Sequence, residues 1–178
     1  MNYQTIEEIY AGNERIRARL KDLLSTLQPE QATALPADEK WTIAEIVEHI
    51  AIVDASTIKI CSKLLKKAQD AGQTSDGKAT ISETFLEGGQ KIAKIKVEAP
   101  SFVQPTGEKS LADSLAKLEE TAELARELRT LFETIGGTEQ KFPHPFFGDI
   151  SAQEWLALKG GHEMRHIKQI EKVLEKLG

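Results

Sequence analysis

Two histidines stand four residues apart in the stretch GGHEMRHIKQI, residues 160–170. Four residues are slightly more than one turn of an α-helix, so His162 and His166 are expected to lie one above the other on one helix face. Two imidazoles at this spacing can bind a single metal ion together. Whether they do so depends on the direction of that face and on a further ligand elsewhere in the chain.

Both histidines fall on the apolar face of the predicted helix. Steps of three or four residues connect Trp155, Leu158, His162, His166, Ile170, Val173 and Leu177. A histidine directed into the core needs partners for its ring nitrogens, because leaving one unsatisfied costs about 1–3 kcal/mol. A metal ion would meet this need for both rings.

The segment HEMRH also matches H-E-x-x-H, the signature of zinc peptidases in which the Glu acts as general base. The surrounding sequence favours another interpretation, because its periodicity is helical and shows no sign of the strands expected around a peptidase helix. Helical stepping places Glu163 off the apolar stripe, on the outer or flanking positions. We therefore expect Glu163 to take no part in the chemistry.

A third histidine can complete a metal site. His49 lies on or beside the apolar stripe of a second predicted helix, residues 42–70. In a helical bundle, side chains of facing helices converge on the core, and metal sites are commonly built there. Three neutral imidazoles suit zinc, nickel or ferrous iron and leave coordination positions open for substrate. The simpler alternative is that the histidines are hydrogen-bonded and purely structural.

Three other residues are weaker candidates. Glu45 precedes His49 by one turn and could orient its ring, but a helix-capping role already explains it. His144 lies between two prolines in the predicted turn KFPHPFFGD and is a weak candidate for a catalytic acid or base. Cys61 is the only cysteine, so it forms no internal disulfide, and we expect a packed, inert thiol.

Four amphipathic helices are expected to position these residues, over residues 5–27, 42–70, 110–135 and 151–177. Each begins with a Ser or Thr followed three residues later by an acid, which is the capping-box pattern. Four such helices in 178 residues predict a single all-α domain, residues 1–178, folded as a four-helix bundle.

The stretch 71–109 is less regular. It combines a loop, a short helix in TISETFLEGG with a capping box starting at Thr80, and an extended crossover rich in proline. A connection of this length can run along the whole bundle, which would let the second and third helices lie parallel.

The composition of the chain restricts the classes of partner and indicates the cellular compartment. The net charge of −5, without a clustered basic surface, argues against nucleic acid. No segment is long and apolar enough to span a membrane, and the first twenty residues lack the apolar run of a signal peptide. The single cysteine fits a reducing compartment. We therefore expect a soluble, cytoplasmic protein.

The segments KWTIAEIVEHI and HPFFGDISAQEWLALKGGHEMRHIKQI resemble the DinB-like (YfiT-like) family. The shared features are the Trp-Thr helix start with a histidine eight residues after the Trp, the HPxFG turn, the Glu-Trp pair and the closing H-x-x-x-H. The resemblance spans essentially the whole chain. It implies a four-helix bundle with up-down-down-up connectivity, often a homodimer, and a divalent metal ion, typically nickel or zinc, held by His49, His162 and His166.

The resemblance also suggests a reaction class. Activities known in the family include thiol S-transferases that use bacillithiol or mycothiol, and a mycothiol-dependent maleylpyruvate isomerase. A small-molecule thiol and an electrophile are therefore the expected substrates of a metal-dependent transferase. Two alternatives remain open: a hydrolase using metal-bound water, and a metal-binding bundle without enzymatic activity. No motif in the sequence selects a substrate.

Overall fold

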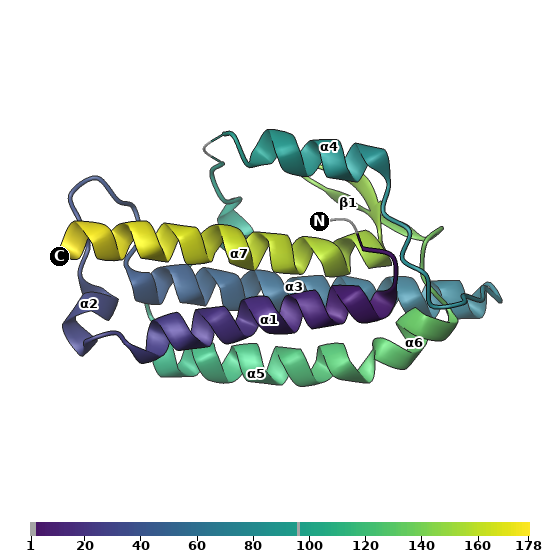
Figure 1. Ribbon diagram of the computed structural model, residues 1–178, viewed down its shortest axis with the longest axis horizontal. Helices are drawn as coiled ribbons and strands as arrows, with labels where there is room; N and C mark the ends of the chain where they lie inside the picture. The colour runs from purple at the N-terminus through teal and green to yellow at the C-terminus, as the bar shows by residue number, and fades with distance from the viewer. Residues whose placement is uncertain (1–2, 96) are drawn as a thin grey trace.

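The computed structural model describes residues 3–95 and 97–178 (Figure 1). The bundle consists of four long helices: α1 (Ile6–Ser25), α3 (Ile43–Asp70), α5 (Leu111–Glu127) and α7 (Ala152–Leu177). Figure 1 shows α1 and α7 running in one direction and α3 and α5 in the other. This is the expected up-down-down-up connectivity, with α3 and α5 parallel.

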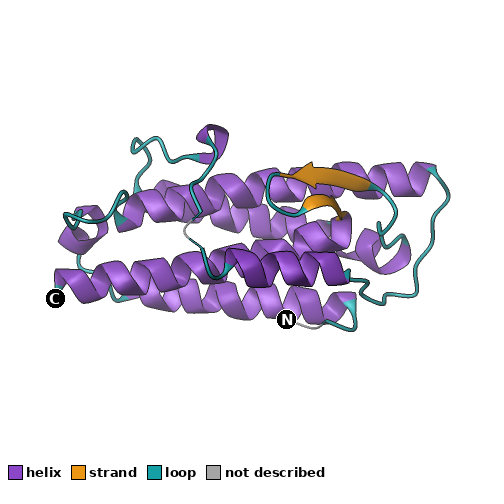
Figure 2. Cartoon of the chain, turned by 90° about the horizontal axis from the view of Figure 1, so that it is seen from above, coloured by secondary structure: helices purple, strands orange, loops and turns teal. Residues whose placement is uncertain are grey.

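Shorter elements connect the four helices: α2 (Pro29–Thr33), α4 (Glu83–Ile92), the 3₁₀ turn η1 (Ser101–Val103), α6 (Arg129–Thr134) and the strands β1 (Lys141–His144) and β2 (Gly148–Ser151). The helix predicted over residues 110–135 is thus two helices that meet at Leu128. The predicted turn around His144 is an antiparallel hairpin in which His144 pairs with Gly148 (Figure 2). Gly148 has a positive φ, which glycine adopts without strain and which lets the chain reverse there.

Capping boxes begin three of the long helices, as predicted. At the starts of α3, α5 and α7, the cap hydroxyl accepts the N–H of the third helical residue, whose carboxylate accepts the N–H of the cap. At α1 only half of the box forms. The Thr5 hydroxyl accepts the Glu8 N–H, whereas the Glu8 carboxylate accepts the N–H of Gln4 instead of that of Thr5.

The crossover between α3 and α5 places α4 outside the bundle, alongside α7 (Figures 1 and 2). No residue of α4 is buried. The predicted cap of this helix is wrong by two residues: the hydroxyl of Ser82, not that of Thr80, accepts the N–H of Phe85 in the first turn. Thr80 remains in the loop because its own N–H is bound by the side-chain oxygen of Gln153 on α7, at 2.6 Å.

Two clusters of buried apolar side chains form the core. One joins the beginning of α1 to the second half of α3 and the beginning of α7; the other joins the end of α1 to the first half of α3 and the second half of α7. Cys61 is fully buried in the first cluster, and burial raises the pKa of its thiol, as expected for a packed residue. Within the described ranges, no helix is long and apolar enough to cross a membrane.

Candidate metal centre

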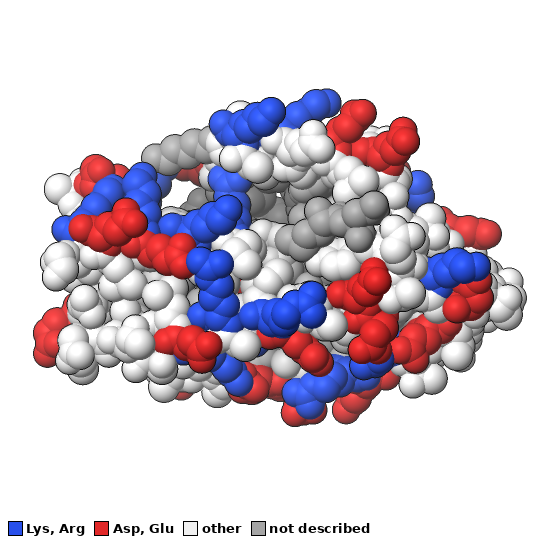
Figure 3. Space-filling model, viewed as in Figure 1, with Lys and Arg blue, Asp and Glu red and all other residues white. Residues whose placement is uncertain are grey.

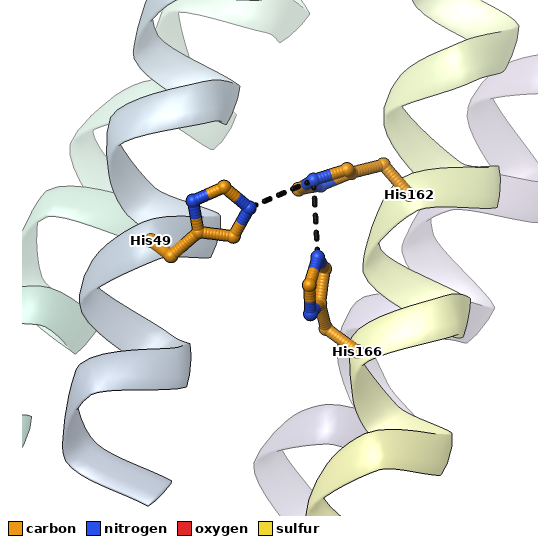
Figure 4. Close-up of side chains that lie close together, drawn as sticks. All are labelled: His49, His162 and His166. Atoms are coloured by element: carbon orange, nitrogen blue, oxygen red, sulfur yellow. Dashed lines mark hydrogen bonds between the residues drawn. The ribbon is translucent and has the colours of Figure 1, made fainter. Parts of the chain in front are cut away.

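Three histidine side chains meet between α3 and α7 (Figure 4). The Nε2 atom of His162 lies 3.1 Å from Nε2 of His49 and 3.2 Å from Nε2 of His166. The ligand atoms of all three lie within 4.8 Å of one another. Helical periodicity on α7 brings two of the rings together, and the packing of α3 against α7 supplies the third.

Neighbouring oxygens determine which nitrogen of two rings carries the proton. His49 Nδ1 lies 2.7 Å from the carbonyl oxygen of Val103, and His166 Nδ1 lies 2.8 Å from the side-chain oxygen of Gln169. Both oxygens only accept hydrogen bonds, so both Nδ1 atoms are donors. In the neutral rings, Nε2 of His49 and of His166 therefore holds a free lone pair, and both lone pairs are directed toward the same point beside His162 Nε2.

The three rings are kept neutral by their surroundings. Burial lowers the pKa of each, and the neighbouring rings lower the pKa of His162 and His166 further. The pKa of His166 falls to about 3. Neutral imidazole is the form that binds metal, so protons compete weakly for these nitrogens near neutral pH.

Two of the three spacings between the ligand nitrogens fit a common metal ion. Nitrogens about 2.0–2.1 Å from a common zinc ion lie about 2.9–3.4 Å apart in tetrahedral or octahedral geometry, and the two contacts of His162 Nε2 fall in this range. His162 Nδ1 is buried and, among the described residues, has no hydrogen-bond partner. In the metal-free ring the lone pairs of His49 and His166 favour the proton of His162 on Nε2, so an ion that binds Nε2 would displace this proton to Nδ1.

The support for His49 comes from a part of the chain that periodicity could not identify. Val103 belongs to η1 in the long crossover, and its carbonyl orients the His49 ring. Trp41 packs against the same ring, with centroids 4.9 Å apart. Glu45 instead completes the capping box of Thr42, in agreement with the structural role expected for it.

His144 does not belong to the three-histidine cluster. It ends β1, and its ring packs against Phe147 and Trp155, with centroids 5.0 and 5.1 Å away. Its Nδ1 accepts the N–H of Phe146. Burial lowers the pKa of His144 to about 4, so it is a neutral side chain of the aromatic hairpin near neutral pH.

The expectation that Glu163 points outward is wrong. Its carboxylate is fully buried and accepts two hydrogen bonds from the Arg17 guanidinium on α1, at 2.7 and 2.9 Å. A helical wheel of α7 alone does not predict this burial, because α7 packs against both α1 and α3 and therefore buries a wider face than a single apolar stripe. A carboxylate bound in this way is a poor general base, which removes the main similarity to zinc peptidases.

Fold and site together define a helical-bundle protein with three clustered histidines that can hold a metal ion. The chain belongs to the DinB superfamily, whose family model matches residues 13–170. It is similar to the uncharacterised protein YuaE of Bacillus subtilis (strain 168), with 26% identity over 163 residues that cover 86% of this chain and 90% of YuaE.

A solved structure has the same fold. The crystal structure of TT2238, described as a four-helix bundle protein, matches with a TM-score of 0.62 and 23% identity, over 94% of this chain and 98% of that one. At this level of identity the match concerns the fold alone. It agrees with the bundle predicted from the sequence.

Proposed function

We propose that His49, His162 and His166 hold a divalent metal ion, nickel or zinc, and that the protein transfers a small-molecule thiol to an electrophile. The observation on which this rests is the convergence of the His49 and His166 lone pairs beside His162 Nε2. Three histidine ligands leave coordination positions for a substrate atom, which distinguishes such a site from a closed structural one.

A bound divalent cation would lower the pKa of a coordinating thiol, so that the thiolate nucleophile exists at neutral pH. The thiolate sulfur would form a bond to the electrophilic carbon, the leaving group departing with its bonding electrons and the thiol proton passing to solvent. The three histidines would hold the ion, and Trp41 packs against the His49 ring. No protein base is needed for this chemistry, because the thiol is already ionised.

The carboxylates near the ligands favour the transferase over a hydrolase. Hydrolysis usually employs a carboxylate or histidine within reach of the attacking water. Glu45 is engaged in its capping box, Glu48 accepts from the backbone and side chain of Thr106, and Glu163 is bound to Arg17. Each of the three already accepts hydrogen bonds from protein groups, which makes it a poorer base toward water.

The surface beside the ligand helix is hollowed. Figure 3 shows the surface hollowed between α4 and α7, with Lys and Arg side chains at its rim. Arg165, which lies between the two histidines of α7 in sequence, donates to the carbonyl oxygens of Ile92 and Ile95 at the end of α4. These bonds hold α4 beside α7.

Elemental analysis of the purified and metal-reconstituted protein tests the metal site. We expect close to one ion per chain, and its loss in His49→Ala, His162→Ala and His166→Ala. His144→Ala is the matched control, since it removes a histidine outside the cluster and should retain the ion. A native protein without metal after reconstitution would contradict the proposal.

A second assay tests the reaction. The metal-loaded protein is incubated with a panel of thiols, bacillithiol and mycothiol included, and small alkylating electrophiles. We expect conjugate formation that requires both the thiol and the metal. Turnover of ester or amide substrates without any thiol would instead support the hydrolase, and no turnover in either assay would leave a metal-binding bundle.

A further inference from the structure

Four charged side chains are buried together one turn from the histidine cluster. The Arg17 guanidinium binds Asp54 at 2.6 Å and Glu163 at 2.7 Å, and the Lys159 ammonium binds Asp54 at 2.9 Å and approaches Glu163 at 3.6 Å. All four side chains are at most 10% exposed. Two cations and two anions make the group electrically neutral. We call these four residues the buried charge network.

The network connects all four helices of the bundle. Arg17 comes from α1, Asp54 from α3, and Lys159 and Glu163 from α7, while a further N–H of Arg17 donates to the carbonyl oxygen of Leu118 on α5. It also lies between the two apolar clusters: on α3 and α7 its members separate the residues of one cluster from those of the other, and on α1 Arg17 directly follows Ile16, the first residue of the second cluster. The core is therefore interrupted by a polar layer at this level.

A polar layer constrains the helices in a way that apolar packing does not. Leucine, isoleucine and valine side chains tolerate small shifts and rotations of one helix against another, because they repack in several arrangements. A bidentate guanidinium–carboxylate pair has one good geometry. Buried polar groups of this kind are best documented as fixing register rather than adding stability.

The network joins the two helices that carry the ligands both directly and through Arg17 of α1. Lys159 and Glu163 flank His162 on α7, and Asp54 follows His49 on α3 by less than two turns. The Asp54–Lys159 ion pair connects α3 to α7 without an intermediate residue. A shift of one helix along the other would break this pair and separate His49 Nε2 from His162 Nε2.

We propose that the buried charge network positions the metal ligands: it fixes the register and rotation of α3 against α7 so that the three Nε2 atoms converge. The inference rests on the proposed metal site and assigns Arg17, Asp54, Lys159 and Glu163 as its positioning residues. Replacing a group that is hydrogen-bonded to a ligating side chain typically changes metal affinity by about 10- to 100-fold, and the network would act on the ligands through the helices that carry them. We expect an effect of this size from the network.

The test replaces all four charges by apolar residues of similar size in one variant, Arg17→Met, Asp54→Leu, Lys159→Met and Glu163→Leu. Its helix content should match that of the native protein. Its Co²⁺ affinity should fall about 10- to 100-fold, and the visible spectrum of the bound Co²⁺ should change, because that spectrum reports the ligand geometry. A purely structural role would leave the spectrum unaltered.

The matched control is Arg19→Met with Glu171→Leu. This ion pair also joins α1 to α7, at 2.6 Å, but on the surface, and its removal should change neither affinity nor spectrum. If the fourfold variant does not fold, the single variant Lys159→Met takes its place. It should weaken Co²⁺ binding, and Lys159→Arg, which can still bind Asp54, should restore it.

Two results would overturn the inference. The first is a network variant that folds and keeps the native Co²⁺ affinity and spectrum; this result refutes the positioning role but not the metal site. The second concerns the case in which the native chain binds no metal, so that the proposed function itself is refuted. In that event, crystal structures of the metal-free native protein and network variant decide, because an unchanged His49–His162 distance in the variant excludes a positioning role.

Discussion

The two glycines that precede His162 should respond in opposite ways to the same substitution. A Cβ added at Gly160 would overlap with Asn13 Oδ1 and lie 3.2 Å from Ile16 Cδ1, both on α1. A Cβ added at Gly161 would meet nothing within 4 Å. Gly160 is therefore the point of close approach between α1 and α7, and Gly161 faces open space.

The magnitudes follow from these contacts. Alanine stabilises a helix interior over glycine by about 1 kcal/mol, so Gly161→Ala should raise the free energy of unfolding by that amount. At Gly160, overpacking subtracts about 1–3 kcal/mol. Asn13 is buried and its amide donates to the Leu156 carbonyl oxygen, so displacing it would break that hydrogen bond. A buried group left unsatisfied costs a further ~1–3 kcal/mol. The net expectation for Gly160→Ala is a loss of about 1–5 kcal/mol.

Urea unfolding followed by circular dichroism measures both variants. The same pair of substitutions in an Asn13→Ala background isolates the contact, since Gly160→Ala should then lose most of its penalty while Gly161→Ala keeps its gain. If Gly160→Ala were as stable as Gly161→Ala in the native background, the close approach of α1 would not restrict the side chain at position 160.

Three further outcomes are expected. Zn²⁺ at a hundred times its dissociation constant should raise the free energy of unfolding by about 2.7 kcal/mol, and His166→Ala should abolish this increase. Because the pKa of His144 is lowered to about 4 in the folded protein, the unfolded chain takes up this proton first as pH falls. As pH falls from about 6.5 to about 4, the free energy of unfolding of the native protein should therefore decrease more than that of His144→Gln. Urea titrations that give parallel pH curves for the two proteins would argue against this. Cys61 should react with a thiol reagent only as the protein unfolds, so rapid labelling under native conditions would contradict its burial.

The periodicity of the sequence was sufficient to predict the long helices and to place the three histidines on their inner faces. His162 and His166 share the apolar stripe of α7, and His49 lies on or beside that of α3. Both placements follow from local helix geometry, so the sequence alone predicts them. The oxygens that orient the rings are of two kinds. Gln169 lies one turn after His166 on the same helix, so a helical wheel could have suggested it. The Val103 carbonyl lies 54 residues from His49, in a crossover whose path no local pattern determines.

Glu163 shows most clearly where local inference ends. In HEMRH it occupies the place of a peptidase general base, and on a helical wheel it lies beside the apolar stripe, so the motif alone allows a catalytic or an exposed residue. Its actual partner, Arg17, is 146 residues away on α1. A signal was present in the chain, since Arg17 directly follows the core residue Ile16 and Asp54 lies within the apolar run of α3. Charges of opposite sign at core positions of different helices are expected to pair, because an unpaired buried charge is strongly destabilising. The role of the acid within this motif is thus decided by the cation that a distant helix presents to it.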